Sequence, residues 1–245
     1  MPHMFTNRPR LMDLTKAHAD LKSQFRWETI NAVLYKIGGV VFIAGSILFF
    51  PAFEKYADYG AWTFFFGSLL YLIVTMHDLL EVRRHWHTMQ SHDLQEILEY
   101  VAAASYLWGT ILFVVGSVFF LSSVGWLRAG AWCFVAGSLL FVTGASVNVL
   151  QIVRSRSLLT LQLMNLTAIA FVVGSVLFTV ASVPYLWDLG DGAVRTILYS
   201  FLAWQYLIGS VLFFLGGVFN YWRAYTVVAQ QIRKASKFPT ASASR

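Results

Sequence analysis

The segment HDLLEVRRHWHTMQSHD, residues 77–93, is the part of the chain where side chains with metal-binding or acid–base chemistry are densest. It contains four histidines and two aspartates, and imidazole and carboxylate groups are ordinary zinc ligands. The candidate metal ligands are His85, His87 and His92. Histidines two residues apart point to different sides of a helix, however, and no Cys-x-x-Cys motif accompanies them. We therefore expect a solvated, partly helical linker without a cofactor, and a metal or redox module is the alternative.

Other patterns of catalysis or cofactor binding are missing from the sequence. No serine, histidine and aspartate, and no cysteine and histidine, are placed as a nucleophilic set. No glycine-rich loop joins a strand to a helix, so no phosphate-binding loop is expected. The single cysteine, Cys133, lies in an apolar stretch, where a small buried thiol is the ordinary interpretation. We expect a protein that is not an enzyme.

Most of the chain consists of long apolar stretches, and the candidate residues lie in these stretches or between them. The chain has 245 residues, of which 58% are hydrophobic and only 12% charged, whereas soluble domains are about 25% charged. Stretches of about 20 apolar residues match the length that a helix needs to cross a bilayer, and they lack the alternation of barrel strands. The predicted fold class is an all-α membrane protein with six transmembrane helices, at about 33–51, 61–80, 101–121, 130–150, 161–183 and 198–219.

The lysines and arginines predict the orientation of these helices. If residues 1–25 and 226–245 both lie in the cytoplasm, only three of the 18 basic residues fall outside: Lys55, Arg128 and Arg195. The positive-inside rule favours this arrangement in a cytoplasmic (inner) membrane. The expected partners are therefore the lipid bilayer and anionic lipid at the cytoplasmic face. The net charge of +6 does not require nucleic acid as a partner.

One sequence motif occurs three times, in the second, fourth and sixth predicted helices, as AWTFFFGSLLY (61–71), AWCFVAGSLLF (131–141) and AWQYLIGSVLF (203–213). The odd-numbered stretches carry a related phrase, seen in VFIAGSILFF (41–50), LFVVGSVFF (112–120) and AFVVGSVLF (170–178). A repeated phrase of this kind indicates one unit that is copied and packed against itself. We expect three repeated helical hairpins, which run in the same direction.

Glycines recur at intervals of seven residues in this pattern. Such spacing keeps small residues on one stripe of a helix, where they let two backbones approach closely in lipid. We therefore assign a helix-packing role, with lining of a pathway as the alternative, to Gly38, Gly45, Gly60, Gly67, Gly109, Gly116, Gly130, Gly137, Gly144, Gly174, Gly209 and Gly216.

Polar residues also recur, toward the predicted cytoplasmic ends of the helices. Asp78, Asn148 and Asn220 each lie eleven residues after the Gly-Ser glycine of an even stretch. Glu28 and Glu99 lie seventeen residues before the glycine of an odd stretch, where the third copy has Ser157. At 1.5 Å per residue, both sets fall near the membrane edge, where capping and snorkelling explain them. A functional ring of polar residues is the alternative.

The stretch RWETINAVLYKIGGVVFIAGSILFFP (26–51), followed by GAWTFFFGSLLYLI (60–73), resembles the YrhK-like membrane proteins. The resemblance implies small two-helix units and no catalytic or ligand residues. It divides the chain into a first unit at 26–85, a second at 97–156 and a diverged third at 157–225.

These observations favour a non-enzymatic membrane protein that acts by packing, self-association as a homo-oligomer or partner binding. A permease with a pathway between the hairpins is the alternative, although charged residues are missing near the middle of the spans.

Overall fold

The computed structural model describes residues 21–88, 93–150, 158–187 and 192–237 of the chain. The elements follow one another as α1 (Leu21–Leu48), η1 (Pro51–Tyr56), α2 (Ala57–Thr88), α3 (Leu94–Phe119), α4 (Leu127–Leu150), α5 (Leu158–Ser182), η3 (Val183–Leu186) and α6 (Ala193–Lys237). Pro51 and Pro184 each lie at the start of a 3₁₀ turn, where their fixed φ and missing N–H are tolerated.

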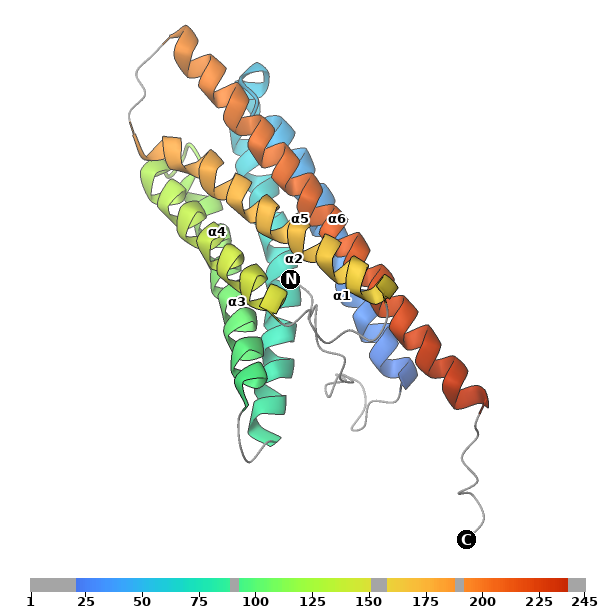
Figure 1. The fold of residues 1–245 in the computed structure, drawn as a ribbon. Helices are drawn as coiled ribbons and strands as arrows, with labels where there is room; N and C mark the ends of the chain where they lie inside the picture. Colours follow the sequence, from blue (N-terminus) through green and yellow to red (C-terminus); the bar gives the residue numbers. More distant parts are fainter. Residues whose placement is uncertain (1–20, 89–92, 151–157, 188–191, 238–245) are drawn as a thin grey trace.

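The described part of the chain holds six helices long and apolar enough to cross a membrane, and the predicted fold class is confirmed. They form three hairpins, α1–α2, α3–α4 and α5–α6 (Figure 1). We call the end at which the two helices of each hairpin are joined, near residues 49–57, 120–126 and 183–187, the hairpin end. The opposite end, where one hairpin leads to the next, is the linker end.

The six helices close into a ring. Each helix packs against its neighbour in the sequence, and α6 packs against α1. Two glycines that lie outside the predicted set allow this closure: a methyl group on Gly39 would lie 3.1 Å from Phe214, and one on Gly217 would lie 2.5 Å from the Tyr35 ring. The ring gives the bundle a pseudo-threefold axis, with one hairpin in each third.

All twelve predicted packing glycines are buried at contacts between helices. A methyl group built on any of them would lie within 3.3 Å of an atom of the paired helix. On α3, for example, a methyl group on Gly109 would lie 2.7 Å from the Phe141 ring and 2.9 Å from the Gly137 carbonyl oxygen. Each hairpin therefore interlocks glycines of one helix with aromatic rings of the other.

The α5 helix is aligned with α1 and α3 differently in the structure than the repeated Gly-Ser motif predicts, and the two alignments differ by seven residues. Gly174 faces the carbonyl oxygen of Gly209, as Gly38 faces that of Gly67 in the first hairpin. Gly174 is therefore equivalent to Gly38 rather than to Gly45, and the equivalent of Glu28 and Glu99 is Met164 rather than Ser157, which lies outside the described residues. A phrase that repeats on a seven-residue stripe fits two registers almost equally well, and only the packing distinguishes them.

Aromatic rings fill the centre of the helix ring. Equivalent residues of α1, α3 and α5 meet there, with ring centroids 6.5 Å apart for Phe42–Phe113, 6.4 Å for Phe42–Phe178 and 5.7 Å for Phe113–Phe178. A second triangle from the even helices has separations of 5.9 Å for Phe64–Phe134, 6.0 Å for Phe64–Tyr206 and 6.4 Å for Phe134–Tyr206. Edge, tilted and stacked contacts of this kind are favourable beyond the area they bury.

Candidate functional site

Polar side chains are buried at the linker end of the bundle. Asp78 is 2% exposed, Asn148 5%, Asn220 1% and Glu99 8%, whereas Glu28 is half-buried. Further polar residues at this end are buried as well, among them Asn31, His77, Glu81 and Arg223. These eight buried residues and Tyr106, nine residues in all, are called the linker-end polar layer below.

The glycine stripes position several members of this layer. Glu81 lies on α2 at the next steps of seven residues after Gly60, Gly67 and Val74. Arg223 continues the stripe of Gly209 and Gly216 on α6 in the same way, and Asn31 precedes Gly38 by seven residues on α1. The glycine stripe of each helix faces the neighbouring helix. Toward the linker end, polar side chains occupy the next positions of the same stripe, so they are buried in the interior.

Hydrogen bonds join members of the layer across helices. The Asn31 Nδ2 lies 3.0 Å from the His77 Nδ1, which links α1 to α2. The Asn148 amide donates to the Tyr106 hydroxyl over 2.8 Å, which links α4 to α3. Within α6, the Arg223 guanidinium donates to the Asn220 side-chain oxygen over 3.3 Å.

The layer combines three carboxyl groups, one imidazole and one guanidinium. Ionised groups are costly to bury without partners, and His77, Asp78, Glu81, Glu99 and Arg223 each take part in further interactions within the protein. Ionisable residues in the interior of membrane helices mark functional sites by default. The sequence analysis missed Asn31, His77, Glu81 and Arg223 as buried residues, although continuing the seven-residue glycine stripes would have found all but His77.

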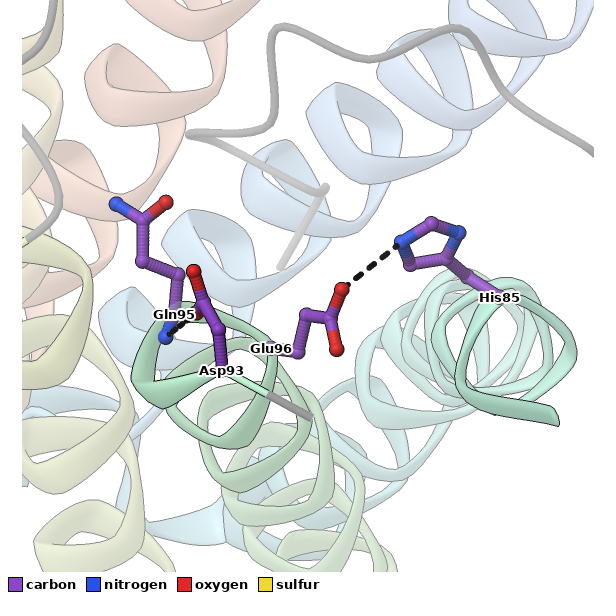
Figure 2. Close-up of polar contacts among 4 residues, drawn as sticks. All are labelled: His85, Asp93, Gln95 and Glu96. Atoms are coloured by element: carbon purple, nitrogen blue, oxygen red, sulfur yellow. Dashed lines mark hydrogen bonds and ion pairs between the residues drawn. The ribbon is translucent and has the colours of Figure 1, made fainter. Parts of the chain in front are cut away.

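The candidate metal ligands are not brought together by the structure. His85 is half-buried near the end of α2, and its Nε2 lies 3.8 Å from the Glu96 carboxylate on α3 (Figure 2). His87 is exposed, and His92 lies outside the described residues. Asp93 caps α3 by accepting a hydrogen bond from the Gln95 backbone N–H (Figure 2). Among the described residues, no three histidine, cysteine, aspartate or glutamate side chains converge as a metal site.

The repeated serines of α1, α3 and α5 bond within their own helices, whereas the Ser68 and Ser138 hydroxyls of α2 and α4 are buried without a hydrogen-bond partner. The hydroxyls of Ser46, Ser117 and Ser175 donate to the carbonyl group four residues earlier. Ser46 also lies 3.0 Å from Ser210, which joins α1 to α6. Such bonds satisfy a buried hydroxyl where no water is present, so Ser46, Ser117 and Ser175 need no aqueous pathway beside them.

The fold and these residues define a multi-pass α-helical membrane protein whose polar groups are buried at one end. The family model described as YrhK-like protein matches residues 25–82 and 96–153, which correspond to most of the first and second hairpins. The chain is therefore similar to the YrhK-like family over two tandem segments, which is consistent with repeated units. Comparisons with curated proteins and with solved structures give no match. The predicted unit boundaries, the third unit included, stay predictions.

Proposed function

We propose that this chain is a non-enzymatic protein of the cytoplasmic (inner) membrane, with both termini in the cytoplasm, that acts by self-association or partner binding. The observation that carries the proposal is the filled axis of the helix ring. The repeated glycines and the repeated phenylalanine and tyrosine rings are used in internal packing, where they contact one another. The outward faces are left for lipid and partners, and they carry exposed tryptophans at the equivalent positions Trp62, Trp132 and Trp204.

The proposal is tested with a photo-crosslinking amino acid placed at Trp132 or Trp204 in living cells. Self-association or partner binding predicts one defined crosslinked band of fixed mass, and a control at the lipid-facing Ile169 on α5 gives none. Crosslinks of similar strength at all three positions indicate diffuse contacts and contradict the proposal.

A permease is the second candidate, because two features lie at opposite ends of one axis. A cavity opens at the hairpin end, and the polar layer lies at the linker end, with the aromatic triangles between them. Transport along this axis requires the rings to move apart. A saturable flux of an ion or solute into liposomes by the purified protein would favour this candidate over the first.

A further inference from the structure

A cavity of about 410 Å³ opens at the hairpin end of the bundle, and all three hairpins contribute to its mainly apolar lining. Ligand pockets in proteins are typically about 300–1,000 Å³. An apolar cavity of only about 150 Å³ in a protein interior is large enough to bind benzene. The hairpin-end cavity therefore has room for a molecule with more than one ring.

Aromatic rings set at different angles form much of the cavity wall. Phe120 meets Tyr185 edge to face, with ring centroids 5.9 Å apart and ring planes at 84°, and it meets Phe49 over 6.5 Å at 53°. Phe134 also lines the cavity, and its ring centroid lies 5.0 Å from that of Phe120 in a tilted contact. Rings at such angles present both faces and edges, the two surfaces that another aromatic ring contacts favourably. The wall therefore suits an aromatic occupant.

The charged and polar groups of the lining do not favour an ionic occupant. The Arg195 guanidinium lies 5.1 Å from the centre of the Tyr199 ring and takes part in a further interaction within the protein. Glu54 carries the opposite charge, so the lining has no net charge, and it is exposed, so water screens it. The Tyr206 hydroxyl already lies 2.8 Å from the Ser182 hydroxyl. An ion that entered the cavity would lose hydration without a matching gain.

We propose that this cavity binds a small neutral aromatic molecule, held against the rings of Phe49, Phe120, Phe134 and Tyr185. Binding removes apolar surface of both the ligand and the rings from water, and contact between rings adds to that gain. An ion of the same shape binds more weakly because of its desolvation, and an aliphatic chain lacks the ring contacts. This ligand site goes beyond the proposed self-association and does not depend on it.

The test is isothermal titration calorimetry on the full chain in lipid nanodiscs, with empty nanodiscs as the blank for partitioning into lipid. The neutral probe is 1-naphthalenemethanol, and its charged analogues are 1-naphthoate and 1-naphthylmethylammonium. A fourth probe, 1-octanol, is neutral but has no ring. We expect one 1-naphthalenemethanol to bind saturably per chain, with the negative heat-capacity change that buried apolar surface produces. The two ions should bind about tenfold or more weakly, and 1-octanol should also bind more weakly.

One variant and its matched control locate the binding. Thr196→Trp places a large ring at the mouth and should remove the saturable heat, since Thr196 lines the cavity and is exposed. Val194→Trp adds the same ring two residues earlier in α6, at a residue that is 78% exposed and does not line the cavity, and it should bind as the native chain does. The proposal is overturned if 1-naphthalenemethanol gives no saturable heat beyond the blank, if an ion or 1-octanol binds as tightly, or if Thr196→Trp binds as Val194→Trp does.

Discussion

At the scale of single residues, the bond between Asn148 and Tyr106 shows what holds polar groups inside an apolar bundle. The Tyr106 hydroxyl is buried and accepts from the Asn148 amide over 2.8 Å. A buried polar group that loses its partner bears its full desolvation cost, about 1–3 kcal/mol. The members of the linker-end polar layer should therefore depend on one another in pairs.

Asn148→Leu should lower the melting temperature in detergent, because it leaves the Tyr106 hydroxyl without this partner. Adding Tyr106→Phe to that variant should recover part of the loss, since the orphaned hydroxyl is then gone. The melting temperatures of the two single variants and the double variant form a double-mutant cycle. Purely additive losses would mean that the bond contributes nothing.

The histidines near the end of α2 lead to a second prediction at this scale. His85 meets Glu96, and His87 points to solvent, so we expect the purified protein to carry no stoichiometric zinc, iron or copper. His85→Ala should change stability by no more than about 1 kcal/mol, as is usual for ion pairs near the surface. Elemental analysis with about one ion per chain, lost in His85→Ala and His87→Ala, would instead favour the metal module.

At the scale of the helices, the glycine stripes decide how closely two helices approach. Gly137 is the middle glycine of the α4 stripe, between Gly130 and Gly144. A methyl group there would lie 2.8 Å from the Phe113 ring and 2.9 Å from the Gly109 carbonyl oxygen. The ring can turn, but the backbone oxygen can move only if the helices separate.

Gly137→Leu should therefore lower the melting temperature clearly, since overpacking typically costs about 1–3 kcal/mol per site. Leu139→Phe is the matched control on the same helix, because Leu139 is 51% exposed and faces outward. It should melt within a few degrees of the native chain. If Gly137→Leu melts normally but alters solute flux into liposomes, the stripe faces a pathway and the packing assignment is wrong.

The helices themselves could be predicted from the sequence because apolar length alone specifies a membrane span. The register of α5 could not be predicted, since glycine and serine recur on a seven-residue stripe and Gly174 matches either of two positions. The burial of Glu81 and Arg223 was also missed. Depth estimated from helical rise places them near the membrane edge, but it does not reveal that neighbouring helices cover them there.

At the scale of the whole molecule, the closed ring separates two different ends. The hairpin end has short turns and an aromatic-lined cavity, and the linker end has buried polar groups and the long α6, which continues to Lys237. Closure of α6 onto α1 depends on Gly39 and Gly217, whose contacts cross from the first hairpin to the last. Sequence repeats could predict three hairpins but not the closure, because neither of these two glycines has another glycine seven residues away; Ser46 and Ser210 hold those positions instead.

The direction in which this ring crosses the membrane is the last prediction. All described basic residues except Lys55, Arg128 and Arg195 lie toward the linker end or on the helix ends that lead to it. Positive residues are retained in the cytoplasm, so the linker end should face inward and the cavity outward. Reporter fusions after residues 90 and 158 should then give cytoplasmic signals, and fusions near residues 56 and 126 should give external ones. The reversed pattern would place the cavity in the cytoplasm, and the charge argument for the orientation would fail.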